Sequence, residues 1–288
     1  MRSALKSEKQ GAKAMSRLTA CFDRLRAENR AAFITFVTAC DPDFDTSLEI
    51  VTGMPDAGAD IIELGMPFTD PSADGPAIDR AAQRALAAGG SMVKTLEIVR
   101  RFRAGNDSTP IVLMGYFNPV YAYGIERFCA DAAQAGADGL IIVDLPPEED
   151  EELRIPANKA GIDVIRLATP TSDDERLPTI LSGASGFVYY VAVAGVTGGK
   201  SATAGDIGAA VKRIKAHTDL PVAVGFGIRT PEQAAAVAST ADAAVVGSAI
   251  VSLIEGGLDD NDKPKTGMSK DVLAFTRELA DGVRSAKR

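Results

Sequence analysis

The sequence contains one histidine, His217, and three scattered cysteines, Cys21, Cys40 and Cys129, among its 288 residues. A metal site with two histidines is therefore excluded, and the cysteines match neither a disulfide framework nor a zinc pattern. His217 is expected at the end of a helix, a poor position for a catalytic group. Catalysis by this chain must then work without an imidazole base, which favours carboxylates and tyrosines as acid–base groups.

Long apolar runs and an excess of basic residues are absent as well. No stretch of about 18 apolar residues occurs, so we expect no membrane span. The 39 acidic and 31 basic residues give a net charge of −8, which disfavours non-specific binding to nucleic-acid phosphates. The basic N-terminal residues lack the apolar core of a signal peptide. Because the cysteines form no disulfide pattern, the cytoplasm is the expected location.

Short apolar segments alternate with longer amphipathic ones along the chain. Segments that are apolar, short and bounded by Gly, Pro or Asp, as buried parallel strands are, lie at residues 33–38, 60–64, 111–114, 139–143, 163–168, 186–191, 221–224 and 243–246. Helices are expected at residues 46–57, 77–88, 92–104, 124–135, 148–160, 172–181, 203–217, 231–239 and 249–255. Such alternation favours an α/β fold, a single closed (β/α)8 TIM barrel of roughly 250 residues, over a doubly wound open sheet.

No convincing linker divides the chain. We therefore expect one domain over residues 1–288, with the barrel at about residues 30–257. An extra helix at about 8–28 precedes the barrel, another at about 269–286 follows it, and residues 1–14 are expected to be a flexible extension.

A short motif that ends in Asp precedes several of the expected strands, as in Gly58-Ala59-Asp60 and Gly136-Ala137-Asp138. The small residue can turn the chain out of a helix, and the Asp is expected to satisfy the turn before the strand begins. The motif indicates that the same helix-to-strand connection recurs along the chain, as in a barrel of repeated units.

One carboxylate is expected inside a buried strand. Glu63 lies between Ile62 and Leu64, near the C-terminal end of its segment. A buried carboxylate costs several kcal/mol unless it is paired or used, and barrel active sites lie at the C-terminal ends of the strands. Glu63 is therefore a candidate catalytic residue, and an internal salt bridge is the alternative.

The loop that follows, residues 65–76, adds Asp70 and Asp74 on a segment that prolines stiffen. A stiff segment holds a catalytic group in place at little entropic cost. The alternative is that the two aspartates form Asx turns or cap the next helix.

Glycines follow two late strands, in Gly225-Phe226-Gly227 and in Gly247-Ser248. Glycine lets backbone amides approach an anion, a helix start adds a positive dipole end, and barrels often bind phosphate after strands 7 and 8. The segment 195–200 could close over the same group, whereas ordinary turns are the alternative. Aromatic residues at or near strand ends, which form either a flat pocket or core, are Phe36, Tyr116, Tyr189 and Phe226.

The segment from Glu63 to Pro76 is similar to the signature of the tryptophan synthase alpha chain family. Residues 36–42, 114–119, 189–198, 225–228 and 247–251 agree with it, so the resemblance covers about residues 20–258. It implies a barrel lyase of tryptophan biosynthesis that cleaves indole-3-glycerol phosphate to indole and glyceraldehyde 3-phosphate by retro-aldol chemistry. It also implies no metal and no cofactor in this chain, because the protonated ring serves as the electron sink.

The resemblance assigns roles to matching positions. Glu63 would protonate the indole ring carbon and later take the proton of the glycerol hydroxyl, Asp74 would hold the indole N–H, and Tyr189 would support the site. The phosphate would lie against Gly198, Gly227, Gly247 and Ser248. The indole would lie among Phe36, Tyr116, Thr197 and Phe226.

The family works with a beta chain that carries pyridoxal phosphate, in an alpha2-beta2 heterotetramer. Indole would pass to that partner through a tunnel, and the loop with Pro67 and Asp70 and residues 116–123 would face it. Some positions depart from the family pattern, with Cys40 where glycine is frequent and Ala192 and Ala194 where hydroxyl residues are expected.

Two other functions remain open from the sequence. A sugar-phosphate isomerase or epimerase could use the same phosphate-binding barrel, although a metal-dependent epimerase lacks its histidines. A catalytically inactive subunit that only activates a beta chain is the other, and the presence of Glu63, Asp74 and Tyr189 argues against it.

Overall fold

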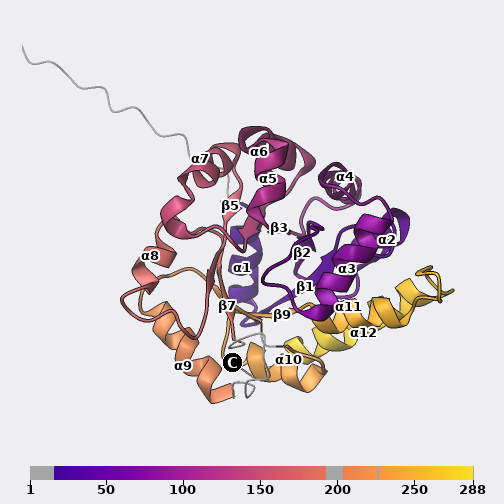
Figure 1. The fold of residues 1–288 in the computed structure, drawn as a ribbon. Coiled ribbons are helices and arrows are strands. Elements are labelled where there is room, and N and C mark those ends of the chain that lie inside the picture. The colour runs from indigo at the N-terminus through magenta and orange to yellow at the C-terminus, as the bar shows by residue number, and fades with distance from the viewer. Residues whose placement is uncertain (1–15, 193–203, 226, 288) are drawn as a thin grey trace, which may run out of the picture.

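The computed structural model describes residues 16–192, 204–225 and 227–287. Parallel strands form a ring at its centre, and helices surround the ring (Figure 1). The strands are β1 Ala32–Thr38, β2 Ile61–Gly65, β3 Ile111–Gly115, β4 Gly139–Ile142, β5 Asp163–Val164, β6 Arg166–Ala168, β7 Val188–Val191, β8 Val222–Gly225 and β9 Ala243–Val246. Their order in the sheet is β5-β4-β3-β2-β1-β9-β8-β7-β6.

The two strands at the ends of this order close the barrel. Only Ile165 separates β5 from β6, and its amide donates to the carbonyl oxygen of Leu140 at 2.9 Å. β5 pairs with β4 and β6 pairs with β7, so together they act as one barrel strand. The predicted (β/α)8 barrel is therefore confirmed, and the open sheet is excluded.

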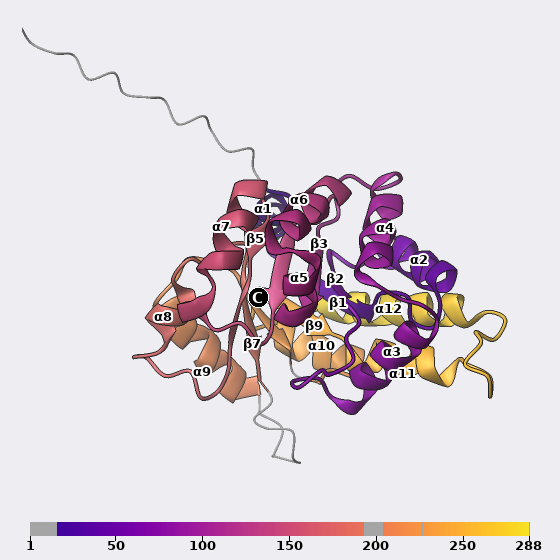
Figure 2. The same ribbon diagram turned by 45° about the horizontal axis from the view of Figure 1, so that its top comes forward.

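The helices in the described part of the chain follow the expected alternation. They are α1 Arg17–Ala27, α2 Phe44–Gly53, α3 Pro76–Ala87, α4 Met92–Arg103, α5 Phe117–Tyr123, α6 Ile125–Ala135, α7 Glu151–Ala160, α8 Leu177–Leu181, α9 Ala204–Lys215, α10 Pro231–Ala238, α11 Ser248–Gly256 and α12 Met268–Arg284, with a 3₁₀ turn η1 at Pro147–Glu149. The C-terminal helix α12 packs against α2, α10 and α11 (Figure 2). None of these helices is long and apolar enough to cross a membrane.

The helix α5 was not predicted, and residues 1–15, which include the expected extension and the start of the first predicted helix, lie outside the described residues. The helix is only seven residues long and ends at Gly124. Such a short helix gives too little periodicity for recognition from sequence.

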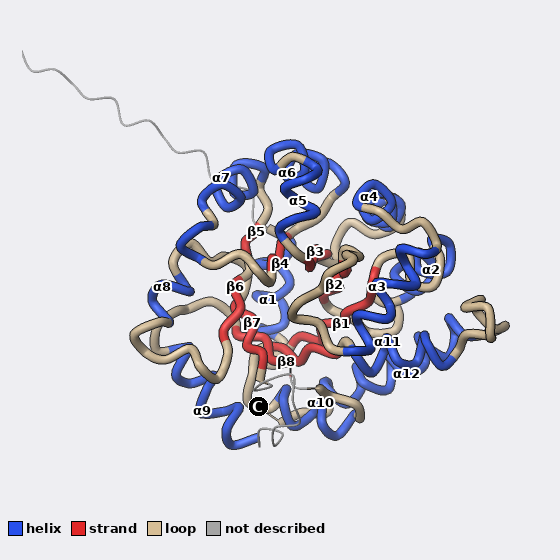
Figure 3. Tube along the Cα trace, viewed as in Figure 1, coloured by secondary structure: helices blue, strands red, loops and turns tan. Residues whose placement is uncertain are grey.

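Side chains alternate between two hydrophobic layers. On β1, Phe33 and Val37 pack outward against the helices, whereas Ile34 points into the barrel. The inner layer includes Leu18 and Phe22 of α1, which lies at the centre of the ring (Figure 3). α1 thus closes the N-terminal end of the barrel and leaves the C-terminal ends of the strands as the open end.

The aspartates that end these recurring motifs hold the N-terminal ends of the strands together. Each carboxylate accepts from a backbone amide at the start of another strand, at 2.8 to 2.9 Å. The pairs are Asp60 with Phe33, Asp138 with Ile111 and Asp242 with Val222. The expectation that the Asp satisfies its own turn is therefore revised, because the bond joins neighbouring strands.

Candidate active site

Glu63 lies on β2 and points into the barrel, since its neighbours Ile62 and Leu64 pack outward. The residue is completely buried, at 0% exposure, and neither carboxylate oxygen has a hydrogen-bond partner among the described residues. The alternative interpretation of Glu63, an internal salt bridge, is therefore not found among the described residues. Burial raises the pKa of Glu63 from 4.5 to about 8, so its carboxyl is mainly protonated at neutral pH.

Tyr189 shares the barrel interior with Glu63. It lies on β7, and its side chain packs with the inner layer. Burial raises the pKa of Tyr189 well above 10, and the negative charge of Glu63 raises it further. The phenol therefore stays neutral and lies close enough to Glu63 to sense its charge.

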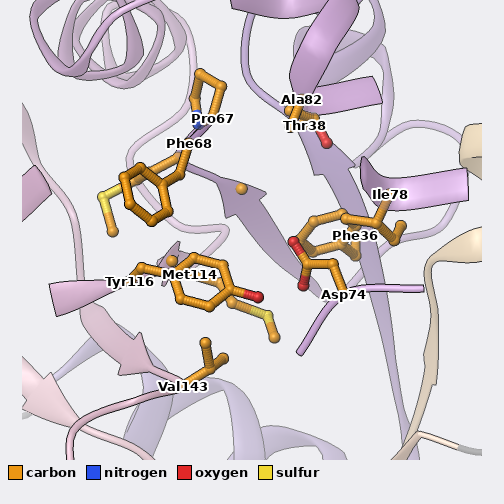
Figure 4. A pocket seen from close by; sticks show the side chains of 13 residues that line it. Phe36, Thr38, Pro67, Phe68, Asp74, Ile78, Ala82, Met114, Tyr116 and Val143 are labelled. Atoms are coloured by element: carbon orange, nitrogen blue, oxygen red, sulfur yellow. The ribbon is translucent and has the colours of Figure 1, made fainter. Parts of the chain in front are cut away.

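A pocket opens at the C-terminal ends of the first strands and contains about 330 Å³ of empty space, part of it open to solvent. Figure 4 shows the Asp74 carboxylate and the Tyr116 hydroxyl facing into it. Its walls are largely apolar. Lining residues that bear on the site are Phe36, Thr38, Pro67, Asp74, Met114 and Tyr116.

The loop that carries Asp74 is tied to β3 through Tyr116. The amide of Ala73 donates to the Tyr116 hydroxyl at 2.9 Å, and that hydroxyl also hydrogen-bonds to Asp74. Burial raises the pKa of Asp74, although the bond from Tyr116 acts in the opposite direction. Asp74 does not cap α3, because Gly75 is the N-cap and no side chain caps the helix.

The Phe36 ring packs against β2 just beyond Glu63. Phe36 pairs with Glu63 across β1 and β2, and a Cβ built on Gly65 would lie 2.7 Å from Phe36 Cζ. The ring therefore lies across Gly65, the next inward position of β2 after Glu63, and needs glycine there. The pocket thus brings together Phe36, Asp74 and Tyr116, whereas Glu63 lies deeper and is not among its lining residues.

The candidate phosphate residues lie at the ends of the last two strands. Gly247 follows β9 as the N-cap of α11, and Ser248 is the first residue of that helix. Gly227 follows β8 with a φ of 66°, and a Cβ built on it would meet nothing within 4 Å. The other candidates, Gly198, Thr197 and Phe226, lie outside the described residues.

The two residues expected to face a partner differ in exposure. Asp70 is exposed and accepts a hydrogen bond from the Thr69 hydroxyl at 2.5 Å. Pro67 is buried and lines the pocket. No group of three or more potential metal ligands occurs in the described part of the chain.

Thr38 and Phe68 are among the pocket residues that sequence reasoning did not single out. The Phe68 ring lies 5.5 Å from that of Tyr116, measured between centroids. The alternation along β1 was the available signal for Thr38, because Ile34, Phe36 and Thr38 share the inner face. Phe68 had no comparable signal, since it lies in an irregular loop.

Residues 22–284 match the family model of the tryptophan synthase alpha chain. The tryptophan synthase subunit alpha from Legionella pneumophila str. Paris is 36% identical with a TM-score of 0.85, covering 94% of this chain and 99% of that one. A chain of tryptophan synthase from M. tuberculosis, in an open form with BRD0059 bound, is 38% identical with a TM-score of 0.82, covering 93% and 99%. This chain therefore belongs to the tryptophan synthase alpha chain family, the lyases that cleave indole-3-glycerol phosphate in tryptophan biosynthesis.

Proposed function

We propose that this chain cleaves indole-3-glycerol phosphate to indole and glyceraldehyde 3-phosphate by a retro-aldol reaction with Glu63 as its acid–base group. The observation that carries the proposal is the state of this carboxyl: it is buried, it has no hydrogen-bond partner among residues 16–192, 204–225 and 227–287, and its pKa is raised to about 8. A carboxyl that keeps its proton at neutral pH can deliver it to the substrate.

In the proposed reaction, Glu63 protonates the ring carbon that bears the glycerol chain, and positive charge develops at the ring nitrogen. Asp74 accepts the ring N–H and stabilises that charge more in the transition state than in the substrate. The carbon–carbon bond then breaks, its electrons return to the ring, and the hydroxyl on the departing carbon gives its proton to Glu63. Glu63 ends protonated, as it began.

Substrate binding requires the site to open. Since the Phe36 ring lines the pocket and packs against β2 just beyond Glu63, we expect this ring to move aside when the indole enters. Tyr189 would keep its place beside Glu63. Tyr116 would border the indole with Thr197 and Phe226, and the phosphate would bind amides at Gly198, Gly227, Gly247 and Ser248, at the start of α11.

We further propose that a beta chain with pyridoxal phosphate covers the open end in an alpha2-beta2 complex in the cytoplasm and receives the indole through a tunnel. The beta chain would supply the only cofactor. The exposed side chain of Asp70 and the 63% exposed Tyr121 support this placement, since both lie on segments at the open end. The family membership and the M. tuberculosis tryptophan synthase structures support it independently.

The proposal is tested by incubating the purified chain with indole-3-glycerol phosphate and measuring indole. Glu63→Gln should lower turnover by roughly 10²–10⁴-fold, the usual contribution of a general acid–base group. Glu97→Gln, which removes an exposed carboxylate on α4, is the matched control and should leave turnover unchanged.

A folded Glu63→Gln variant with full activity would contradict the role of Glu63. A wild-type chain that forms no indole but stimulates a beta chain would instead indicate an inactive subunit. Isomerisation of a sugar phosphate without indole formation would favour the isomerase.

A further inference from the structure

Thr38 is the last residue of β1, and its side chain faces the pocket that contains Asp74 (Figure 4). It shares the inner face of the strand with Ile34 and Phe36 and is 2% exposed. The position places a hydroxyl in a wall that is otherwise mostly apolar.

The Thr38 hydroxyl has no hydrogen-bond partner among the described residues. Other buried threonines do have one: Thr35 donates to Met54 Sδ at 3.1 Å, and Thr276 donates to the Val272 carbonyl oxygen at 2.8 Å. An unsatisfied buried hydroxyl costs about 1–3 kcal/mol. No hydrogen bond from the described residues offsets this cost, so the hydroxyl is free to bond to a partner once the ligand is bound.

The Asp74 carboxylate is an acceptor in the pocket that can take a further hydrogen bond. The Tyr116 hydroxyl accepts one hydrogen bond from Ala73 and uses its single proton in the bond to Asp74. A carboxylate offers about four acceptor positions, and Tyr116 uses only one at Asp74. An indole N–H would use a second, which leaves room for Thr38.

We propose that Thr38 is a positioning residue, whose hydroxyl donates to the Asp74 carboxylate, directly or through one water, once substrate fills the pocket. This inference rests on the proposed function. Held by Tyr116 from one side and Thr38 from the other, the carboxylate is fixed toward the ring N–H. The benefit grows with the charge on the ring, so it acts on kcat more than on KM.

The test compares three variants of the full chain with indole-3-glycerol phosphate as substrate. Thr38→Val keeps the shape and removes the hydroxyl, and should lower kcat by about 10-fold or more with KM changed less than about twofold, as expected for a hydrogen bond to a charged group. Thr38→Ser restores the hydroxyl and should recover most of the activity. Thr35→Val, which removes a buried hydroxyl outside the pocket, is the matched control and should keep wild-type turnover.

Two further measurements separate positioning from a structural role. The Tm of Thr38→Val should equal or exceed that of the wild type, because the lost hydroxyl has no hydrogen-bond partner among the residues that the structure describes. The acidic limb of the kcat–pH profile should move to higher pH, because Asp74 loses a donor that favours its charged form.

Wild-type kcat in Thr38→Val, failure of Thr38→Ser to recover activity, or a Tm that falls together with kcat would each overturn the proposal for Thr38. These outcomes differ from a failure of the proposed function, in which the wild-type chain itself releases no indole.

Discussion

At the scale of single residues, the carboxyls of Glu63 and Asp74 differ in their hydrogen-bond partners. Glu63 has no hydrogen-bond partner in the described part of the chain and keeps its proton at neutral pH, whereas Asp74 accepts a hydrogen bond from Tyr116 at the edge of the pocket. Burial raises both pKa values, but at Asp74 the Tyr116 bond opposes it. Different surroundings can thus give two residues of one chemical type the separate roles of proton donor and charge stabiliser.

The raised pKa of Glu63 predicts a pH dependence of stability. The unfolded chain ionises Glu63 above about pH 4.5, whereas the folded protein holds the proton until about pH 8. The folded state therefore binds the extra proton between these values, and the Glu63 contribution to the free energy of unfolding falls as pH rises through this window. The loss is up to about 5 kcal/mol, since one pKa unit corresponds to about 1.4 kcal/mol.

Denaturant unfolding of the wild type and Glu63→Gln at pH 5, 6.5 and 8 measures this contribution. The difference in unfolding free energy between the two proteins should change across the series in the variant's favour. A constant difference would mean that Glu63 has an ordinary pKa in the folded protein.

Some residues could be interpreted from the sequence and others could not. Glu63 stood out because a charged side chain is rare inside an apolar strand, whereas Asp74 was singled out by its proline-stiffened loop and by the family resemblance. Thr38 did not stand out, because threonine is frequent in buried strands and only the pocket shows its unpaired hydroxyl. Cys40 departs from the family pattern, and the structure gives it a φ of 67°, in the left-handed region that favours the usual glycine.

At the scale of elements, an ion-pair network joins α3 to α11. Arg84 of α3 donates twice to Asp41 at 2.9 and 3.0 Å and once to Glu255 of α11 at 3.2 Å. Arg80 donates twice to Glu255, at 2.6 and 2.9 Å. α3 follows the Asp74 loop and α11 starts at Ser248, so the network joins the helices next to the proposed indole and phosphate ends of the site.

Burial predicts unequal effects for the two arginines. The Arg84 and Asp41 side chains are 9% and 0% exposed, so Arg84→Ala leaves Asp41 buried and unpaired and should cost about 3–5 kcal/mol of unfolding free energy. Arg80 is 51% exposed, and Arg80→Ala should cost less than about 1 kcal/mol. Urea unfolding of both variants measures these differences. Equal losses of unfolding free energy would show that burial does not increase the contribution of the Arg84–Asp41 pair.

The order of the strands could be predicted, but the break within one of them could not. Hydrophobic periodicity located the barrel strands because buried parallel strands are short apolar runs. It gave no sign of the break at Ile165, since that residue is as apolar as its neighbours. The break follows from barrel closure, where one strand changes its partner from β4 to β7.

At the scale of the whole molecule, we propose that residues 1–288 form one domain, with the barrel at about residues 30–257. The described strands and the helices between them build one closed ring, and α12 packs on its outside. The expected extension at residues 1–14 lies outside the described residues.

A beta chain is expected to raise the turnover of this chain. Binding over the open end would order the Asp70 loop and the segment at Tyr121, and so favour the arrangement in which Asp74 meets the ring. Indole formation measured against increasing amounts of purified beta chain should rise to a plateau. Albumin at the same concentrations serves as control, and a flat response to the beta chain would contradict the proposed coupling.

In the described part of the chain, the helix α1 closes one end of the barrel, where Leu18 and Phe22 fill the interior. A small molecule made inside would therefore leave through the open end, by the route through which its precursor arrived. Product departure and substrate arrival therefore compete for one passage. A protein that docks over the open end after the substrate has bound would therefore determine where the product goes. It would do so without touching the reacting atoms.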